Sequence, residues 1–360
     1  MSQKEVIISG GGTAGHLYPA LAVGQKLKEQ EPDLHLTFVG SSRSLERNIM
    51  KQYRANFIPL RIEGIKGKGL RVIKSLFLLP LSFFKSLAIL IRMKPNLVVG
   101  VGGYSSGPIV LLASWMKIPT LILEQNLYPG FTNKLLLPWV KRAVVSFRNS
   151  LSSFKGKGIF IGNPVREEFY NLASKQISNK LTLLIFGGSQ GSHFLNKAIV
   201  LTLPLIKEAR ENLRIFHQTG EKDLDWVKTS YAQNGFKDIT VAPYFFDMAS
   251  YFQKADLIIS RAGATTIAEL VSSRKAALLV PFSKASDNHQ VLNARELEKI
   301  KAAEVILEEE FTPEILAQKI LYFMNNKEEI NQMEKNLDEM RTENAAAKIS
   351  KLCFELMETQ

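Results

Sequence analysis

The sequence lacks a second cysteine and an amino-terminal signal-peptide pattern, and its first half has few acidic residues. Its single cysteine, Cys353, excludes an intramolecular disulfide and any metal site built from several cysteines. The first residues form a charged pair before a short apolar stretch, without the long apolar region of a signal peptide. We therefore expect a cytoplasmic protein.

Acidic residues are scarce only in the first half, so the formal net charge of +12 is unevenly distributed. Residues 1–162 contain 22 Lys and Arg against 7 Asp and Glu, whereas residues 163–360 contain 24 against 27. A strongly basic half is suited to an anionic partner, and the two candidates are nucleic acid and an anionic membrane surface.

The basic residues of the first half are concentrated in residues 61–94, where eight basic side chains and one acidic one alternate with Leu, Ile and Phe. No uncharged run in this segment reaches the roughly 18 residues that cross a bilayer, and Pro80 interrupts it. Apolar side chains rimmed by Lys and Arg are typical of a peripheral contact with an anionic leaflet. The candidate membrane residues are Lys74, Phe77, Leu78, Phe83 and Phe84.

Two other interpretations of residues 61–94 remain. The same pattern would arise from two core helices with solvated lysines. Nucleic acid is disfavoured, because the phenylalanines lie within apolar clusters and are not spaced among polar groups as stacking platforms would be. We therefore expect a membrane contact and no nucleic-acid partner.

A strand, a glycine-rich turn and a helix recur along the chain. At 360 residues the chain exceeds one typical domain, so two domains are expected. The recurrence predicts an α/β fold of two doubly wound, Rossmann-like domains that face each other across a cleft. The strands that precede these turns are Val6–Ser9, Leu97–Val101, Leu181–Phe186 and Leu257–Ser260.

The domain boundary is expected at Gly162, where a turn containing Pro164 has no following strand and the charge balance changes. The first domain would then span residues 1–162 and the second residues 163–342. From Thr312 onward the sequence is helical and highly charged. Its last helix, residues 343–360, is expected to return to the first domain.

Glycine-rich turns between a strand and a helix bind phosphate through backbone N–H groups and the positive end of the helix dipole. Two such turns in the first domain, residues 10–16 and 102–108, fit a ligand with more than one phosphate. Gly10, Gly12 and Gly15 also match the dinucleotide fingerprint, but no acidic residue closes the second strand after Val39. A nicotinamide-dependent oxidoreductase is therefore disfavoured.

The second domain has polar side chains at the carboxyl ends of two strands, where ligands bind in open α/β sheets. Arg261 follows one strand, and Glu269 lies in the helix that comes next, within reach of ligand hydroxyls. His289, Gln290 and Asn293 follow the other strand. A phosphate and a diol side by side suggest a nucleotide, although an ordinary βα loop would contain the same residue types.

His16 is the sole histidine in the glycine-rich turns of the first domain. The helix after it is expected to begin near Tyr18 or Pro19, since proline suits the first helical turn. A histidine at such a position often acts as a cap or a packing group. In a phosphate-binding turn a neutral imidazole would instead accept a hydroxyl proton near pH 7, so His16 is the candidate general base.

Eight motifs cover nearly the whole chain. They are GGTAGH at 11–16, GGYSSGP at 102–108, EQN at 124–126, GNPVR at 162–166, GGSQGS at 187–192, HQTG at 217–220, RAGATTIAE at 261–269 and HQVLNA at 289–294. Each motif alone is weak, but eight in this order resemble the MurG family of peptidoglycan glycosyltransferases, which has the two-domain GT-B fold. Ala14 and Leu123 stand where the family usually has glycine and histidine.

The resemblance implies transfer of N-acetylglucosamine from UDP-N-acetylglucosamine (UDP-GlcNAc) to the C4 hydroxyl of the muramoyl sugar of lipid I, an undecaprenyl-linked muramoyl-pentapeptide. The products would be lipid II and UDP, with inversion at the anomeric carbon. It also implies a peripheral protein on the cytoplasmic face of the cell membrane, associated with other cell-wall synthesis proteins. No aspartate pair at metal-ligand spacing lies beside the turns, so no metal or other cofactor is expected.

By position, the resemblance places the sugar nucleotide mainly on the second domain and the lipid diphosphate on the first. The implied donor residues are Thr13, Ala14, Gly15, Asn126, Arg166, Ser189, Gln190, Phe245, Arg261, Ala264, Thr265, Thr266, Ile267, Ala268, Glu269, His289 and Gln290. The implied acceptor-diphosphate residues are Gly11, Gly12, Gly102, Gly103, Tyr104 and Ser105.

Within the donor site, Ser189 and Gln190 would face the diphosphate. Phe245 would frame the uracil, largely through its backbone. Glu269 would bind the ribose hydroxyls, and Gln290 would bind the hydroxyls of N-acetylglucosamine.

Inverting transfer is an in-line displacement, which needs a base on the acceptor hydroxyl and stabilisation of the departing charge. His16 would supply the base. Arg166 and Arg261, with the helix N–H groups of residues 264–268, would neutralise the leaving diphosphate. Asn126 would reach the donor sugar from the first domain.

Two further functions compete with this one. A diacylglycerol glycosyltransferase would share the fold and the lipid acceptor, but the EQN, GNPVR and HQVLNA motifs favour the MurG family. A sugar-nucleotide sensor would bind the donor without turnover.

Overall fold

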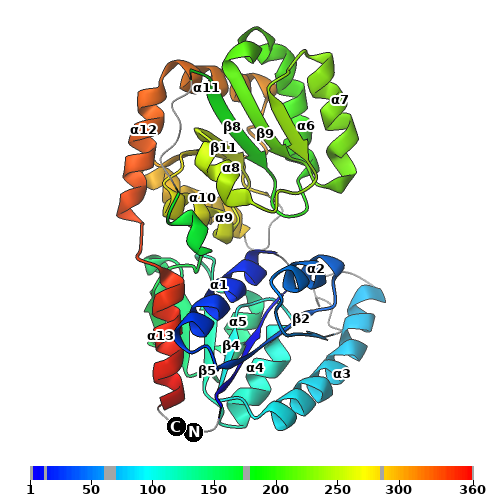
Figure 1. Ribbon diagram of the computed structural model, residues 1–360, viewed down its shortest axis with the longest axis vertical. Coiled ribbons are helices and arrows are strands. Elements are labelled where there is room, and N and C mark those ends of the chain that lie inside the picture. Colours follow the sequence, from blue (N-terminus) through cyan, green and yellow to red (C-terminus); the bar gives the residue numbers. More distant parts are fainter. Residues whose placement is uncertain (1–2, 12–13, 61–69, 173–178, 284–287, 359–360) are drawn as a thin grey trace. The chain divides into compact units, whose positions relative to one another are not determined.

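The polypeptide forms two units, passing from the first to the second and then back to the first. The computed structural model describes residues 3–11, 14–60, 70–172, 179–283 and 288–358, and the side chains of Ala14, Leu45 and residues 70–79 lie outside this description. Unit 1 comprises residues 1–166 and 342–360, and unit 2 comprises residues 167–341 (Figure 1).

Unit 1 is built on a parallel sheet. Its described residues give seven strands in the order β3-β2-β1-β4-β5-β6-β7. Strands β4 (Leu97–Gly100) and β5 (Thr120–Glu124) are buried along their whole length, as expected where helices cover both faces of a sheet. The other strands are β1 (Glu5–Ser9), β2 (His35–Ser41), β3 (Phe57–Leu60), β6 (Arg142–Val145) and β7 (Gly158–Phe160).

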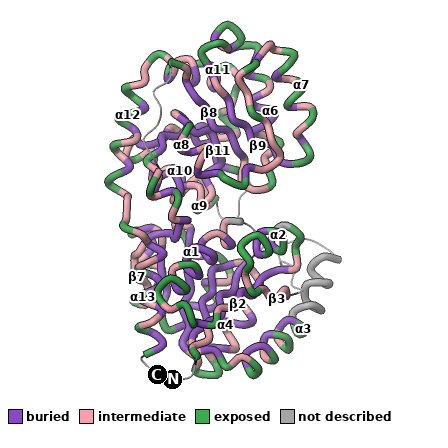
Figure 2. The backbone as a smooth tube through the Cα atoms, viewed as in Figure 1, coloured by how far each residue is buried: buried purple, intermediate pink, exposed green. Residues whose placement is uncertain are grey.

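The helices of unit 1 form two separate cores with the sheet. Buried residues occur in both the strands and the helices of this unit (Figure 2). One core contains side chains of α1 (Ala14–Gln30), α2 (Ser44–Gln52) and α13 (Ala345–Glu358). The other contains side chains of α3 (Leu70–Met93), α4 (Ser106–Trp115), α5 (Phe131–Leu136) and the 3-10 helix η1 (Arg148–Phe154). The last helix of the chain therefore belongs to the core of unit 1, where it packs against α1.

Unit 2 repeats the same arrangement. Its described residues give a six-stranded parallel sheet in the order β10-β9-β8-β11-β12-β13. The strands are β8 (Leu181–Phe186), β9 (Leu213–Gln218), β10 (Ile239–Ala242), β11 (Leu257–Ser260), β12 (Ala277–Leu279) and β13 (Ala303–Val305).

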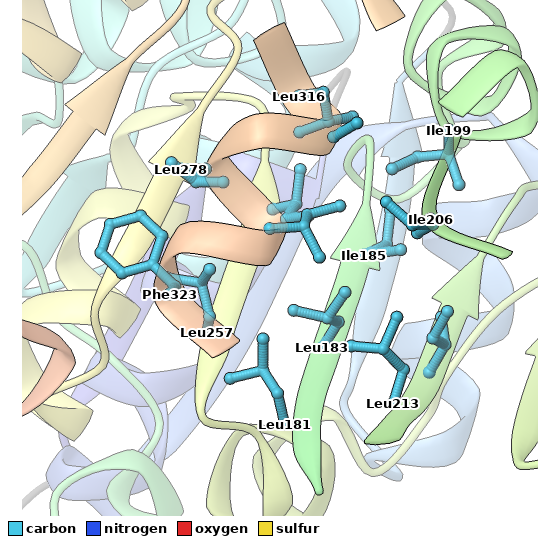
Figure 3. Close-up of a cluster of buried hydrophobic side chains, with 14 of the residues drawn as sticks. Leu181, Leu183, Ile185, Ile199, Ile206, Leu213, Leu257, Leu278, Leu316 and Phe323 are labelled. Atoms are coloured by element: carbon cyan, nitrogen blue, oxygen red, sulfur yellow. The ribbon is translucent and has the colours of Figure 1, made fainter. Parts of the chain in front are cut away.

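The main core of unit 2 lies between this sheet and helices from both ends of the unit. Figure 3 shows Leu183 and Ile185 of β8, Leu257 of the adjacent β11 and Leu278 of β12, the next strand, in one cluster with Leu316 of α11. The contributing helices are α6 (His193–Thr202), η3 (Leu203–Asn212), α7 (Leu224–Gln233), α11 (Pro313–Asn325) and α12 (Lys327–Asn336). The remaining α-helices of the described part are α8 (Met248–Lys254), α9 (Ala264–Ser273) and α10 (His289–Lys299).

Two helix predictions are wrong. Helix α1 begins at Ala14 and not near Pro19, which lies inside it, so His16 occupies the first helical turn. Helix α3 continues through Pro80, where the sequence indicated an interruption. After the proline, the buried side chains of Ile89 and Leu90 join the core of unit 1, and this packing offsets the lost backbone hydrogen bond. Among the described residues, no helix combines the length and apolarity needed to cross a membrane.

Candidate active site

Each sheet has a point where the strand order reverses, between β1 and β4 in unit 1 and between β8 and β11 in unit 2. In doubly wound sheets, ligands bind outside the carboxyl ends of the strands at this point. The turns that follow these four strands hold most of the predicted site residues. The topology therefore brings the predicted turns together in pairs, one pair in each unit.

In unit 1 the turns after β1 and β4 touch through their backbones. A Cβ atom on Gly103 would lie 2.1 Å from the carbonyl oxygen of Gly11, so only glycine allows this approach. Gly102 and Gly103 have φ angles of 93° and 78°, which L residues with side chains rarely adopt. The glycines thus allow the backbones of the two turns to lie in direct contact. Gly12 and Thr13, predicted in the same place, lie outside the described residues.

His16 lies between these two turns. A Cβ atom on Gly102 would be 2.9 Å from His16 Nε2, so the imidazole packs directly over that glycine. The same Cβ would lie 3.6 Å from Gln125 Oε1, which places the turn after β5 beside the pair. His16 is half-buried, and its neighbours Ala14 and Gly15 begin α1.

The turn after β4 leads into the amino terminus of α4, where Tyr104 is half-buried and Ser105 is buried. The hydroxyl of Ser106 donates to the carbonyl of Gly103 at 2.9 Å and fixes the turn. Ser105 Oγ is buried without a hydrogen-bond partner among the described residues. A buried hydroxyl beside helix N–H groups is a suitable donor to an anion.

Glu124, at the end of β5, is a structural carboxylate. Its oxygens accept hydrogen bonds from the backbone N–H groups of Asn126 and Gly130 and from the Asn126 and Asn133 amides, at 2.8 to 3.2 Å. Burial raises the pKa of Glu124, and these four hydrogen bonds oppose the shift. The carboxylate therefore fixes the loop that carries Asn126, the predicted contact to the donor sugar.

Arg166 does not lie in unit 2, where the sequence analysis placed it. It is the last residue of the first segment of unit 1, and its guanidinium is centred 4.4 Å above the ring of Tyr18 in α1. The side chain is buried. Its position next to α1 places it in the same unit as His16, and the expected boundary at Gly162 shifts to Arg166.

In unit 2 the turn after β8 packs on the turn after β9. A Cβ atom on Gly191 would lie 1.9 Å from the carbonyl oxygen of Thr219, and one on Gly220 would lie 2.3 Å from that of Gln190. Both glycines have positive φ angles. This contact holds Ser189, which is half-buried, and Gln190, which is exposed, at the carboxyl edge of the sheet.

Gln218 connects the turn after β8 to the predicted uracil segment. Its amide nitrogen donates to the carbonyl of Gly188 at 2.9 Å, and its amide oxygen accepts from the N–H of Phe245 at 2.7 Å. The Phe245 ring is buried and stacks on Tyr251, with centroids 3.9 Å apart. Its side chain is therefore turned away from any ligand, and only its backbone can frame a base.

Arg261 connects three segments of unit 2 through its guanidinium, and its predicted contact with the leaving diphosphate stays a prediction. Its guanidinium donates to Ser192 Oγ at 2.9 and 3.1 Å and to the carbonyl of Val280 at 3.0 Å, and it pairs with Glu308 at 2.6 Å. Only about 6% of the residue is exposed. Ser192 is the N-cap of α6, so Arg261 fixes the end of the turn after β8.

Helix α9 begins at the reversal point, with Gly263 as its N-cap. Of its predicted residues, Ala264, Thr265, Thr266 and Ala268 are half-buried, and Ile267 and Glu269 are buried. His289 and Gln290 open α10, and Gln290 Oε1 accepts from the N–H of Phe282 at 2.9 Å. The structure thus brings these two helix starts to the same edge of one sheet.

A buried polar chain beneath the turn after β9 was not predicted. His217 Nε2 lies 3.0 Å from Asn196 Oδ1, and His217 Nδ1 lies 3.1 Å from the Tyr231 hydroxyl. The Asn196 amide nitrogen donates to the Thr219 carbonyl at 2.9 Å and to Asp223 at 2.7 Å. Burial lowers the pKa of His217 to about 3, against the opposing charge of Asp223, so the ring is neutral. The chain supports the turn on which Gly191 packs.

The predicted membrane segment falls on α3. The side chains of Lys74, Phe77 and Leu78 lie outside the described residues, Phe83 is half-buried, and Phe84 is about 73% exposed. The structure adds two exposed aromatic residues, Trp115 at the end of α4 and Trp139 after α5, whose rings are 6.0 Å apart. They were missed because isolated tryptophans give no periodic signal. Among the described residues, no three acidic, His or Cys side chains form a metal-binding group.

Curated relatives match this chain over almost its full length. A protein of Desulfotalea psychrophila is 40% identical over 99% of this chain and 97% of its own, and one of Myxococcus xanthus is 39% identical over 98% and 93%. Both are named UDP-N-acetylglucosamine--N-acetylmuramyl-(pentapeptide) pyrophosphoryl-undecaprenol N-acetylglucosamine transferase. The crystal structure of Acinetobacter baumannii MurG superposes with a TM-score of 0.76 at 31% identity, covering 98% of this chain and 99% of that one.

Two Rossmann-like units with paired turns at their reversal points make up the GT-B fold. The family models agree, since the glycosyltransferase family 28 N-terminal domain matches residues 6–145 and the C-terminal domain of that family matches residues 182–352. The chain belongs to glycosyltransferase family 28 and, within it, to the MurG family.

Proposed function

We propose that this protein transfers N-acetylglucosamine from UDP-GlcNAc to the C4 hydroxyl of the muramoyl sugar of lipid I, giving lipid II and UDP. The observation that carries the proposal is similarity at 40% identity, over nearly the whole of both chains, to a transferase named for this donor sugar and this undecaprenyl acceptor. The paired turns in each unit supply one site for the donor and one for the acceptor.

The donor is assigned to unit 2. The backbone N–H groups of the turn at residues 187–192 and of the start of α9 would bind the diphosphate, with the positive ends of α6 and α9 favouring negative charge. The backbone of Phe245 would frame the uracil, and Glu269 would accept from the ribose hydroxyls. Gln290 would bind the sugar.

The acceptor is assigned to unit 1. The turns that meet at Gly11 and Gly103, with the buried hydroxyl of Ser105, would hold the lipid diphosphate. His16 would take the proton from the C4 hydroxyl as that oxygen attacks the anomeric carbon, while the bond to UDP breaks on the opposite side. The electron pair of the broken bond stays on the diphosphate of UDP, and the N–H groups of unit 2 would stabilise this negative charge.

Attachment to the cytoplasmic face of the cell membrane is assigned to exposed aromatic side chains of unit 1, Phe84 of α3 and the adjacent Trp115 and Trp139. Exposed aromatic and apolar side chains next to Lys117 and Lys141 combine burial in the interface with attraction to anionic lipid. Lys157 Nζ donates to the carbonyls of Leu137, Pro138 and Val140 at 2.7 to 3.0 Å and fixes the turn that presents Trp139.

The test is transfer of radiolabelled N-acetylglucosamine from UDP-GlcNAc to a lipid I analogue. We expect a labelled disaccharide lipid and release of UDP. UDP-glucose and UDP-galactose serve as competing donors, since a diacylglycerol glycosyltransferase would use one of them with diacylglycerol. Absence of transfer to the lipid I analogue, in a preparation that binds UDP, would refute the proposed acceptor.

A further inference from the structure

Glu308, which no motif singled out, joins two loops of the proposed donor site. It lies after β13, and its side chain is about 13% exposed. One carboxylate oxygen pairs with Arg261 at 2.6 Å. The other accepts from the Ser283 N–H at 3.2 Å and from the Ser283 hydroxyl.

The contacts of Arg261 extend this connection to the diphosphate turn. Arg261 donates to Ser192 Oγ, which also accepts from the N–H of Leu195 as the N-cap of α6. Ser283 follows the strand β12, in the segment that leads toward Gln290. One carboxylate is therefore connected, through three side chains, to the loops proposed to bind the diphosphate and the sugar.

We propose that Glu308 is a positioning residue, which sets the donor loops of unit 2 through Arg261 and Ser283 without contacting the donor. The inference rests on the proposed function, because it takes the turn at residues 187–192 as the diphosphate site. It assigns to Arg261 the role of fixing Ser192, in place of direct contact with the leaving group.

The charge of Glu308 is needed because Arg261 is buried. Burial lowers the pKa of Arg261, and the hydrogen bond and charge of Glu308 oppose that shift. Burial alone would raise the pKa of Glu308, but Ser283 and Arg261 lower it below its usual value, so the carboxylate is ionised at neutral pH. Without the carboxylate, the buried guanidinium of Arg261 loses its counter-charge and one of the hydrogen bonds that fix its orientation.

The first experiment compares Glu308→Gln with Glu309→Gln, an exposed neighbour whose replacement removes the same charge. We expect Glu308→Gln to raise the Kd for UDP and the KM for UDP-GlcNAc about tenfold, the loss expected when a charged hydrogen-bond partner is replaced. The KM for the lipid I analogue should stay within about twofold, and Glu309→Gln should match the unmodified chain. A role in general stability would reduce the active fraction without changing the donor KM alone.

A double-mutant cycle with Ser192→Ala tests the route through Arg261. If Glu308 acts through Ser192, the Kd for UDP of the double variant should be no higher than that of the single variant with the higher Kd. Ser283→Ala, which leaves the ion pair in place, should raise the Kd by a smaller factor and provides a readout if Glu308→Gln does not fold.

Three results would overturn the inference. A wild-type Kd for UDP in both Glu308→Gln and Ser283→Ala would show that the carboxylate does not position the loops. Multiplicative losses in the double variant would show that Glu308 and Ser192 act independently. Failure of the unmodified chain to bind UDP would remove the proposed function as well, which distinguishes that failure from the other two.

Discussion

At the scale of single residues, His16 is oriented by backbone from a different turn. Its imidazole packs over Gly102, where any side chain would collide with Nε2 or Cδ2. The positive φ of Gly102 and the absence of a Cβ atom are thus requirements of the histidine position. The proposed proton transfer depends on this fit between the turns after β1 and β4.

Replacing His16 with alanine should lower kcat by a factor on the order of 10² to 10⁴, the usual contribution of a positioned general base. The Kd for UDP should not change, because the donor is assigned to unit 2. Steady-state transfer assays with calorimetry of UDP binding measure both quantities. His35→Ala, an exposed histidine of β2, is the matched control. A near-normal kcat for His16→Ala would show that another group takes the proton.

His217 should make the stability of unit 2 depend on pH. Burial lowers its pKa to about 3 in the folded state, from an ordinary value of 6.5. Between these values the unfolded chain binds a proton that the folded chain does not, so stability falls as pH falls below 6.5. The effect of His217 on the free energy of unfolding is constant above pH 6.5. Below that pH the free energy of unfolding decreases until the pH reaches the folded-state pKa of about 3.

Urea unfolding at pH 7 and pH 5 tests this expectation. His217 should reduce the free energy of unfolding by roughly 2 kcal/mol between the two conditions. His217→Gln should be less stable at pH 7, since it loses buried hydrogen bonds, but its loss between pH 7 and pH 5 should be smaller by that amount. Glu124, whose raised pKa acts in the opposite direction, is present in both chains and cancels. Equal losses in the two chains would contradict the assignment.

Which polar residues would stand at the strand ends could be predicted, but not where their side chains point. Arg261, Glu269 and Gln290 follow buried strands as expected, yet Arg261 is bound to three groups of the protein. A basic residue after a strand has the same sequence pattern whether it faces a ligand or a neighbouring loop. Glu308 had no signal at all, because its partners come from segments far away in the sequence.

At the scale of elements, strands that are buried along their whole length could be predicted from the sequence. Strands buried along their whole length, such as β8 and β11, form apolar runs whose bounds were predicted correctly. The short strands β3, β6 and β13 were missed, since runs of three or four residues that include a proline or a charged residue resemble a loop. Strand pairing supplies the stability that their own sequences do not indicate.

The exposed aromatic side chains of α3, α4 and the turn after α5 are proposed to attach the protein to the membrane. Replacing Trp115 and Trp139 with serine should lower the partition coefficient onto anionic vesicles by about tenfold or more, because two large apolar side chains no longer enter the interface. Vesicle sedimentation at two salt concentrations measures both the apolar and the electrostatic parts. Tyr322→Ser, which removes an exposed aromatic ring of unit 2, is the control. Unchanged binding of the double variant would exclude this surface as the membrane contact.

At the scale of the whole molecule, the two units share one topology and differ in charge. Each places its paired turns at the reversal point of a parallel sheet, so the same phosphate-binding geometry occurs twice. Most of the excess positive charge lies in residues 1–162. Repetition of the geometry supports the proposal that each half binds a diphosphate, and the charge difference supports the proposal that the first half meets the membrane lipid.

The assignment of the donor to unit 2 and the acceptor to unit 1 predicts which backbone amides each ligand protects from hydrogen exchange. In hydrogen exchange on the full chain, UDP should slow exchange at residues 187–192, 218–220 and 261–269, because a bound diphosphate opposes local opening of the turns it touches. A lipid I analogue should instead protect residues 101–107. The turn at 101–107 serves as the internal control for UDP, since it has the same glycine-rich geometry but belongs to the other unit. If UDP protected residues 101–107 alone, the assignment would be reversed: unit 1 would bind the donor and unit 2 the acceptor.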